Sequence, residues 1–411
     1  MLTVEKIGGT SMSQFRHVLE NIIHLPGEKE FRYGRVLVVS AYGGVTNLLL
    51  EDKKTGAPGI YTWFVNNENY EDELDKLHLH LREINTKFEE IGLNLVEANL
   101  FLKERIEQTR AYLNSMEKVI SSGYVGRKNI FLAARELLAS LGEAHSAYNT
   151  VNILKNRGIK AQLVDLTGFH DPTGYTIDQR ISKAFSKVDY RNKIVVATGY
   201  TRGVEGIMRE FDRGYSEVTF SKIAVLLNAD EAIIHKEFHL SSADPLIVGP
   251  ENTIIVGNTN YDVADQLADV GMEAIHPKSA KPLERASINL RIKNTFDPHH
   301  PGTLIKKDYV GRESKIEIIT GSDEIIVIEI HDSSMVGQVG FDYEIMKLFK
   351  AHHVSYIMKA TNANSISLVI WEKELSTGLV QDLKTAFESV RVEKMAVVFL
   401  IGSNIAQPGV L

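Results

Sequence analysis

The sequence is dominated by a repeated unit in which an apolar strand runs into a short glycine-rich turn and then into a helix. In the clearest copy, RVLVVSAYGGVTNLLL at residues 35–50, Gly43 and Gly44 separate the strand from a helix predicted to begin near Thr46. Further strands are predicted at residues 159–164, at 194–197 and after a helix that begins near Ser216. Because strands that alternate with helices usually pair in parallel, the pattern predicts an α/β fold with a mainly parallel sheet.

The opening stretch, LTVEKIGGTSMSQFRHVLENII, has the same layout. A short strand runs into Gly8 and Gly9, and either Ser11 or Ser13 is placed to cap the helix that follows. Taken alone, such a Gly-Gly pair is more often a tight turn than a phosphate-binding loop. Its meaning therefore depends on the rest of the chain.

Residues 51–125 interrupt the alternation of strands and helices. They are rich in Glu, Lys, Asn and Leu, and YEDELDKLHLHLREINTKFEEIG reads as one long amphipathic helix. We interpret this segment as a helical insertion. Its His78 and His80 lie two positions apart and so face different sides of a helix, and no metal site is predicted there.

The pattern changes again after residues 291–305, where we place a domain boundary. Residues 306–394 read as strand, helix, strand, strand and helix, and with a strand over 395–401 this is the order of a βαββαβ sandwich. Because residues 396–411 resemble residues 326–341, we expect residues 395–411 to be the first strand of an incomplete second copy. The alternative is that this strand closes the first sandwich.

Composition narrows the class of function. The 411 residues are enough for two or three domains, and a net charge of -7 without a basic stripe argues against a nucleic-acid partner. The chain has no cysteine, which excludes disulfides and thiol catalysis. We find neither a secretory signal pattern nor an apolar run of about 20 residues, so a cytoplasmic protein without a membrane partner is expected.

Several strand ends carry glycines, although the chain contains no G-x-x-x-x-G-K-[ST] sequence of the P-loop type. Backbone N–H groups at such turns and at helix N-termini approach anions closely, which suits a polyphosphate. Lys6 in the first loop would then neutralise charge on a phosphoryl group in transfer. The ordinary alternatives are that Lys6 is a solvated strand-end charge and that Glu143, beside Gly142, is a first-turn helix acid.

These motifs occur together and in a specific order: KIGGTS, VVSAYGGVTNLLL, GE after an apolar helix, RGYSE, SSADP, AIHP and KNTFDPHHPGTLI. With them the chain resembles the aspartate kinases over nearly all of its 411 residues, and it looks like the subgroup associated with ectoine-biosynthesis gene clusters. The resemblance implies an amino-acid-kinase-like (carbamate-kinase-like) three-layer sandwich over residues 1–305 and an ACT regulatory domain over residues 306–394. It also implies ATP and L-aspartate as substrates, with Mg²⁺ arriving with ATP.

The resemblance further implies a role for each matching residue. Glu143 would accept from the ammonium group of aspartate, and Arg213 would bind its α-carboxylate. The residues expected to bind aspartate are Ser40, Thr46, Glu143, Arg213 and Ser216. The residues expected to bind ATP are Lys6, Gly8, Gly9, Ser11, Lys236 and Asp244, within a pocket partly lined by residues 235–244. Catalysis is assigned to Lys6, Gly9 and Glu217.

Three positions depart from the pattern of the aspartate kinases. Glu217 stands where the family usually has Asp, and Lys236-Glu237 stands where a Thr-Asp pair is common. Glu273 replaces a nucleotide-phosphate lysine three residues before the His-Pro pair, which reverses the charge there. The contacts to ATP therefore follow less directly than those to aspartate, and Lys236 or Lys278 is the candidate for the missing positive charge.

The expected reaction is transfer of a phosphoryl group from ATP to the side-chain carboxylate of L-aspartate. One alternative is another enzyme of the same fold, such as an acetylglutamate-type kinase, and a second is a non-catalytic amino-acid sensor. The resemblance also suggests a homodimer and an amino-acid effector bound at the ACT domain. Which amino acid acts as effector does not follow from the sequence.

Overall fold

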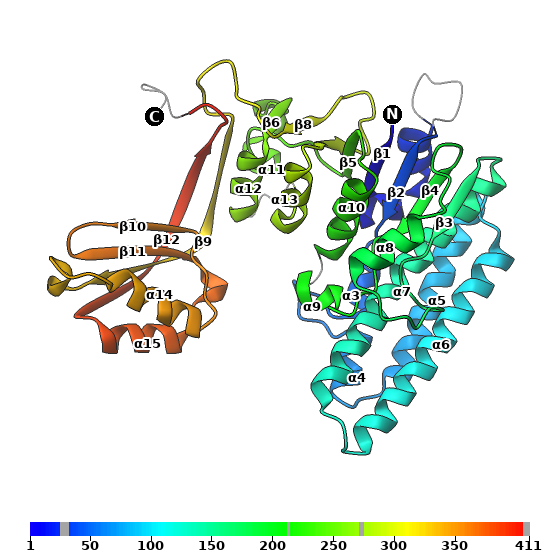
Figure 1. Cartoon of the computed structure of the whole chain (residues 1–411), viewed down its shortest axis with the longest axis horizontal. Helices are drawn as coiled ribbons and strands as arrows, with labels where there is room; N and C mark the ends of the chain where they lie inside the picture. Colours follow the sequence, from blue (N-terminus) through cyan, green and yellow to red (C-terminus); the bar gives the residue numbers. More distant parts are fainter. Residues whose placement is uncertain (25–32, 212–213, 271–274, 406–411) are drawn as a thin grey trace. The chain divides into compact units, whose positions relative to one another are not determined.

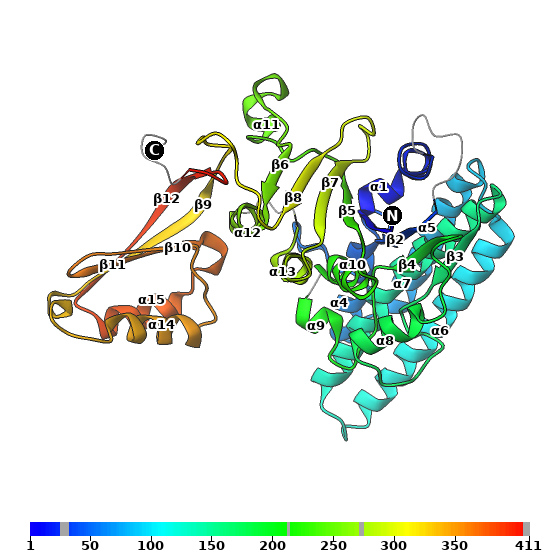
Figure 2. The same ribbon diagram turned by 45° about the horizontal axis from the view of Figure 1, so that its top comes forward.

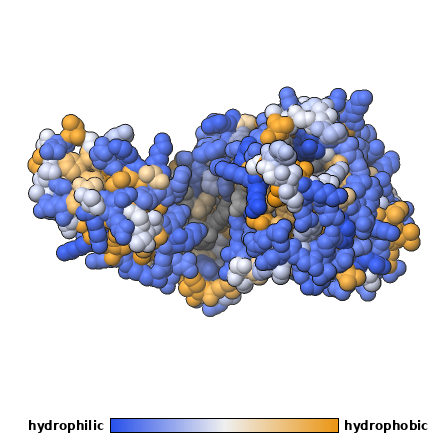
Figure 3. Space-filling view, turned by 90° about the horizontal axis from the view of Figure 1, so that it is seen from below, coloured by the Kyte–Doolittle hydropathy of each residue, from blue (hydrophilic) through white to orange (hydrophobic). Residues whose placement is uncertain are grey.

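The computed structural model describes residues 1–24, 33–211, 214–270 and 275–405, which form two compact units (Figure 1). The first unit comprises residues 1–240, 255–261 and 275–309, and the second comprises residues 241–254, 262–274 and 310–411. On the face drawn in Figure 3 hydrophilic residues predominate, in line with a charged fraction of 24%.

The first unit is built on an eight-stranded sheet in the order β3-β4-β2-β1-β5-β7-β8-β6. All neighbouring strands pair in parallel except β7 and β8, which confirms the predicted mainly parallel sheet (Figure 2). Its strands are β1 (Thr3–Ile7), β2 (Arg35–Val39), β3 (Ala161–Val164), β4 (Ile194–Thr198), β5 (Glu231–Lys236), β6 (Asn258–Asn260), β7 (Asn289–Asn294) and β8 (Thr303–Lys306). Strands β2 and β4 are buried throughout because helices cover both faces of the sheet.

The two faces of β1 show how the three layers arise. Side chains alternate along a strand, so Glu5 and Lys6 point to opposite faces. Lys6 meets Glu217 of α10 (Tyr215–Leu226) on one face. Arg35, which binds Glu5 on the other face, donates to the carbonyl of Ile22 in η1 (Leu19–Ile23). Helical segments thus enclose the sheet from both sides, as the three-layer sandwich requires.

The segment expected to be a helical insertion contains α4 (Ile60–Val65), α5 (Tyr70–Glu89) and α6 (Leu95–Ser121), and it is followed by the long α7 (Arg127–Asn156). The side chains of Asn69 and Asn94 accept backbone N–H groups at the starts of α5 and α6. The remaining helices of the first unit are α1 (Gly9–Ser13), α2 (Phe15–Val18), α3 (Val45–Leu49), α8 (Ile177–Phe185), α9 (Ile207–Phe211) and α13 (Pro277–Arg285).

The predicted serine cap at the first helix is wrong. Helix α1 begins at Gly9 with Gly8 as its N-cap, so Ser11 and Ser13 lie inside the helix. The Ser13 hydroxyl instead accepts the amide of Gly43 at 2.7 Å and thereby ties the helix to the second glycine-rich loop. The helix starts early because β1 runs into it with only Gly8 between them.

The second unit contains a four-stranded antiparallel sheet in the order β10-β11-β9-β12, with α14 (Phe341–Ala351) and α15 (Thr377–Ala386). Its strands are β9 (Ile318–His331), β10 (Met358–Thr361), β11 (Ser365–Trp371) and β12 (Ser389–Ile401), so that the chain order is βαββαβ. The core is mainly aliphatic, with Ile328, Ile330, Leu368, Leu379 and Leu383, and it also contains Phe349 and Phe387. Smaller elements of this part of the chain are α11 (Pro245–Val248), η3 (Pro250–Asn252), α12 (Tyr261–Asp269), η4 (Ser333–Met335) and η5 (Glu372–Glu374).

The structure shows residues 395–401 as a continuation of β12. Residues 389–395 pair with residues 325–331 and complete the sandwich, and after an irregularity residues 397–401 pair with residues 318–322 of β9. The strand therefore both closes the first sandwich and extends past it. A second copy that begins at residue 395 stays a prediction, and residues 406–411 lie outside the described residues.

A charged cluster is buried in the sheet directly beside the Lys6 position. Both oxygens of Glu5 accept from the Arg35 guanidinium at 2.7 Å, and Oε2 also lies 2.9 Å from Nε2 of His235. Burial alone would raise the pKa of Glu5, but Arg35 and His235 together hold it well below its ordinary value. The cluster links β1, β2 and β5 by charge pairing as well as by backbone hydrogen bonds.

We expect Glu5→Gln to lower the free energy of unfolding by about 3–5 kcal/mol, because it leaves the buried Arg35 without its charged partner. The double variant Glu5→Leu/Arg35→Met should lose less, since it leaves no unpaired charge. Chemical denaturation of the three proteins checks this order. Equal stability of Glu5→Gln and the parent would contradict it.

Candidate active site

The glycine-rich loops that follow β1 and β2 lie against each other. The amide of Gly43 lies 3.0 Å from the carbonyl oxygen of Gly9, to which it donates. A Cβ atom on Gly9 would stand 2.7 Å from the carbonyl oxygen of Ala41, too close for any side chain without movement of the backbone. Parallel pairing of β1 with β2 brings the loops to one edge of the sheet, where their amides suit an anion.

We expect Gly9→Ala to lower activity at least tenfold and to destabilise the fold by about 1–3 kcal/mol, the usual range for overpacking. Gly126→Ala is the matched control, because its added Cβ would meet nothing within 4 Å. Steady-state rates and thermal unfolding of both variants check the prediction. Wild-type behaviour of Gly9→Ala would show that the two loops need no close approach.

Lys6 is held at the end of β1 by a carboxylate. Its Nζ lies 3.5 Å from Oε1 of Glu217, and the two side chains are only 13% and 12% exposed. The other oxygen, Oε2, accepts the backbone amide of His276 at 2.7 Å. Burial would raise the pKa of Glu217, but Lys6 and Lys236 lower it below the ordinary value, so Glu217 is ionised at neutral pH.

Glu143 is a buried carboxyl group on α7. It is 1% exposed, and its Oε1 accepts the Ser216 hydroxyl at 2.6 Å. Its Oε2 is buried and has no hydrogen-bond partner among the described residues. Burial raises the pKa of Glu143 to about 8, although Ser216, Lys6 and the nearby backbone amides of Tyr200 and Ala41 act in the opposite direction.

The alternative reading of Glu143 as a first-turn acid is wrong, because α7 begins at Arg127 and places Glu143 in the middle of the helix. Gly142 is required by close packing and does not mark the start of the helix. A Cβ atom at this position would come within 2.8 Å of the Ala41 side chain, so α7 packs closely under the second loop. A buried mid-helix carboxyl with a free oxygen points to a cationic ligand.

The structure brings Ser40 and Ser216 to the same region as Glu143. The Ser146 hydroxyl, three residues along α7 from Glu143, donates to the carbonyl of Ser40 at 2.8 Å. Thr46 lies in α3 directly after the second loop and is partly exposed. These contacts gather the ends of β1 and β2 and the N-terminus of α10 around the carboxyl of Glu143.

Two residues expected to bind ATP have their polar groups engaged within the protein. Ser11 is fully buried and its Oγ shares a hydrogen bond of 2.9 Å with Oγ1 of Thr295. The amide of Gly8 donates to the carbonyl of His235. Their contribution to the loop is therefore structural in this state, and their binding of phosphate stays a prediction.

The remaining candidates fall into three groups. The charge of Lys236 helps to lower the pKa of Glu217, whereas the Lys278 ammonium donates to the carbonyl of Glu210 at 3.0 Å; binding of ATP by either lysine stays a prediction. Asp244 lies in the second unit, where its side chain caps α11 by accepting the amide of Leu246. Arg213 and Glu273 lie outside the described residues.

The sequence reasoning missed the part played by His276. Its backbone amide fixes Glu217, and a Cβ atom on Gly214 would stand 3.1 Å from its imidazole ring. His276 is the N-cap of α13, with Pro277 at the first helical position. A proline at the first helical position marks the start of a helix. The AIHP motif could therefore have indicated that the backbone amide of His276 is available to donate a hydrogen bond.

Among the helices of the described residues, none combines the length and the apolar character needed to cross a membrane.

Comparison with known proteins identifies the family. Residues 1–294 match the model of the amino acid kinase family. The aspartate kinase Ask_Ect of Stutzerimonas stutzeri (strain A1501) is 45% identical over 418 residues, covering 100% of this chain and 88% of the relative. Aspartokinase 1, chloroplastic, of Arabidopsis thaliana is 28% identical and covers 97% of this chain and 68% of the relative.

Solved structures share the fold. The aspartate kinase of Clostridium acetobutylicum matches with a TM-score of 0.71 and 23% identity over 99% of this chain and 88% of that one. Aspartokinase III of E. coli, in complex with lysine and aspartate, matches with a TM-score of 0.71 and 20% identity over 100% of this chain and 89% of that one. The chain therefore belongs to the amino acid kinase family and, within it, to the aspartokinases.

Proposed function

We propose that the protein transfers the terminal phosphoryl group of ATP to the side-chain carboxylate of L-aspartate, giving ADP and 4-phospho-L-aspartate. The observation that carries the proposal is the buried Glu143 carboxyl with its unpartnered Oε2, set beside the Lys6–Glu217 pair and the two glycine-rich loops. The names of the aspartokinase relatives support the same reaction.

Recognition of aspartate follows from the charges around Glu143. An ammonium group placed against Oε2 would satisfy a buried acceptor that otherwise lacks a donor. It would also favour the ionised carboxylate, because a nearby positive charge stabilises that form. Ser40, Thr46 and Ser216 are proposed to line the rest of the site, and Arg213 is proposed to bind the α-carboxylate by the bidentate geometry that arginine offers.

The phosphoryl transfer needs positioning and charge more than proton chemistry. The aspartate carboxylate is already a nucleophile, so no strong general base is required. Lys6, held by Glu217, would balance negative charge on the transferring group, with amides of the loop at Gly9 around it. Lys236, whose charge lowers the pKa of Glu217, and Lys278 are the proposed candidates for the missing nucleotide cation.

ATP is proposed to lie against the two glycine-rich loops, whose close approach at Gly9 and Ala41 sets their backbone amides at one edge of the sheet. Mg²⁺ usually keeps several water ligands and binds through substrate phosphates and one or two carboxylates, so we propose that it is held chiefly by ATP. When bound, it would neutralise phosphate charge.

The wider setting is also proposed from the resemblance. The βαββαβ sandwich of the second unit is the proposed site of an amino-acid effector, and the protein is proposed to act as a homodimer in the cytoplasm. The similarity to Ask_Ect favours ectoine biosynthesis as the downstream use of the product, with lysine, threonine and methionine as the alternative.

A hydroxylamine-trapping assay tests the proposal. With MgATP, the protein is compared with L-aspartate, with N-acetyl-L-glutamate and without an acceptor. Hydroxamate that forms only with L-aspartate is expected, because an acetylated amine carries no charge for Glu143. Hydroxamate with N-acetyl-L-glutamate would indicate an acetylglutamate-type kinase, and none with any acceptor would favour an amino-acid sensor.

A further inference from the structure

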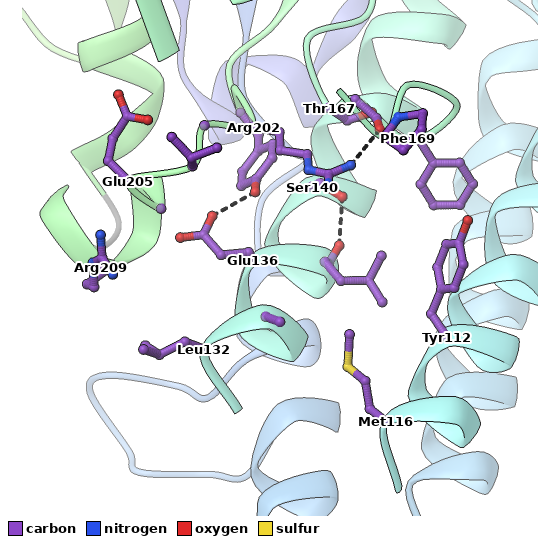
Figure 4. A pocket seen from close by; sticks show the side chains of 18 of the residues that line it. Tyr112, Met116, Leu132, Glu136, Ser140, Thr167, Phe169, Arg202, Glu205 and Arg209 are labelled. Carbon is purple, nitrogen blue, oxygen red and sulfur yellow. Dashed lines mark hydrogen bonds between the residues drawn. The ribbon is translucent and has the colours of Figure 1, made fainter. Parts of the chain in front are cut away.

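A cavity separate from the residues assigned to aspartate opens within the first unit. Its volume is about 720 Å³, which is within the range of small-molecule sites. It lies between α6, α7 and two loops, one following β3 and one following β4 (Figure 4). The cavity wall includes neither Glu143 nor Ser216, Ser40 or Lys6.

One wall of the cavity is apolar. Tyr112 and Met116 of α6 face it from one side (Figure 4), and Leu132 and Leu137 of α7 also line it. The Phe169 ring lies edge-on to Tyr112, with ring centroids 6.0 Å apart. Met and aromatic side chains of this kind adapt to an aliphatic or aromatic group of moderate size. The apolar wall therefore favours a ligand with an uncharged side chain.

The opposite wall is charged, with both signs present. Glu136 points from α7 towards the loop after β4, where its carboxyl accepts the Tyr200 hydroxyl at 2.6 Å and the amide of Met208 at 2.8 Å (Figure 4). Arg202 donates to the backbone carbonyls of Gly168 at 3.0 Å and Asp171 at 3.3 Å. Arg209 lies close enough to Glu136 for its charge to oppose the rise in the pKa of that carboxyl group, and its Nε lies 3.8 Å from the Glu210 carboxylate.

We propose that this cavity binds a free α-amino acid with an apolar side chain as an effector of the kinase. Its carboxylate would pair with the guanidinium groups of Arg209 and Arg202, its ammonium group with Glu136, and its side chain with Met116 and Phe169. The charge pattern matches a zwitterion, because the wall offers the guanidinium groups of Arg202 and Arg209 to a carboxylate and the carboxyl groups of Glu136 and Glu205 to an ammonium group.

A continuous set of contacts joins this cavity to Glu143. The Tyr200 hydroxyl that binds Glu136 belongs to a ring that packs edge-on against Tyr215, with centroids 5.8 Å apart. Tyr215 directly precedes Ser216, which donates to Glu143. An occupant that displaces Glu136 would thus shift the residues assigned to aspartate, and the expected consequence is a changed KM for aspartate. This consequence rests on the proposed function, whereas binding itself does not.

The test uses the full chain and L-leucine as the probe, measured by isothermal titration calorimetry. We compare it with 4-methylpentanoate, which lacks the ammonium group, and with 3-methylbutylamine, which lacks the carboxylate. Saturable binding of L-leucine is expected, and each analogue should bind at least tenfold more weakly because one charge-assisted contact is lost. A shift of the aspartate KM by L-leucine in the hydroxamate assay is the functional readout.

Two variants locate the binding. Arg209→Gln should weaken binding of L-leucine at least tenfold, and Met116→Trp should abolish it by filling the cavity. Arg16→Gln is the matched control, because the Arg16 side chain is exposed on α2. Absence of binding of L-leucine, L-methionine and L-phenylalanine would overturn the proposal, and so would leucine binding that survives both variants. Leucine binding without aspartate-dependent hydroxamate would uphold this site and remove the kinase function instead.

Discussion

Replacement of Lys6 by methionine should lower kcat by about 10²-fold or more, the scale seen when one preorganised charge-stabilising group is lost. Lys6 is 13% exposed and is fixed by Glu217, so its ammonium group needs little reorganisation when charge develops on the phosphoryl group. Methionine keeps the length and the apolar stem of the side chain. The loss should therefore fall on kcat rather than on folding.

Steady-state kinetics with aspartate and ATP varied separately check this expectation. The KM for aspartate should change little, because Glu143 and not Lys6 carries its proposed ammonium contact. Lys6→Arg is the companion variant, since it keeps the charge and should retain more activity than Lys6→Met. A loss of less than tenfold in kcat for a folded Lys6→Met protein would show that Lys6 has a structural role and no large catalytic one.

The second large effect is expected at Glu143. Glu143→Gln should lower kcat/KM for aspartate by about 10²-fold, because a neutral amide cannot pair with the ammonium group in a buried site. The volume and the hydrogen bond to Ser216 are nearly conserved. The loss should therefore appear mainly in the KM for aspartate, while the KM for ATP stays close to that of the parent.

The same residue predicts a pH dependence. Because the pKa of Glu143 is raised to about 8 in the free protein, the carboxylate that binds an ammonium group is in the minority at neutral pH. The kcat/KM for aspartate should therefore rise as the pH increases towards about 8, and Glu143→Gln should lack this rise. A pH profile identical in the two proteins would contradict the assignment.

The contribution of Glu143 to the free energy of unfolding should fall with rising pH, whereas kcat/KM for aspartate should rise. Between the ordinary value of 4.5 and about 8 the folded protein holds a proton on Glu143 that the unfolded chain releases. The contribution of this group to the free energy of unfolding therefore falls as pH rises through that window. Saturating aspartate should reduce the effect, because the ammonium group stabilises the ionised form.

The positions of the strands and of the glycine-rich loops could be predicted from the sequence because they depend on local patterns. Residues 36–39 are apolar and three of them are β-branched valines, and Gly43-Gly44 marks the turn between this strand and the next helix. The prediction of the serine cap was wrong because contacts with distant parts of the chain determine where the first helix begins. Ser11 has a capping side chain, but the strand runs into the helix after Gly8 alone, and the hydroxyl pairs with Thr295 far along the chain.

In the candidate site, too, the sequence identifies the residues but not the properties that depend on packing. Lys6, Glu143 and Glu217 were placed by matching motifs, but no local pattern reveals that Oε2 of Glu143 lacks a partner or that burial raises its pKa. Those properties arise only when α7, α10 and the two loops pack together. The path of β12 past the sandwich is likewise set by its pairing with β9, in which Val397 lies opposite Ser322, 75 positions earlier in the chain.

The most direct test of the proposed phosphoryl transfer is to identify the trapped product chemically. With MgATP, L-aspartate and hydroxylamine, we expect the hydroxamate of the side-chain carboxyl group, formed in equal amount with ADP. At low aspartate the Glu143→Gln variant should not form it. Chromatographic separation distinguishes it from the α-hydroxamate. Formation of the α-hydroxamate, or release of ADP without any hydroxamate, would contradict the account.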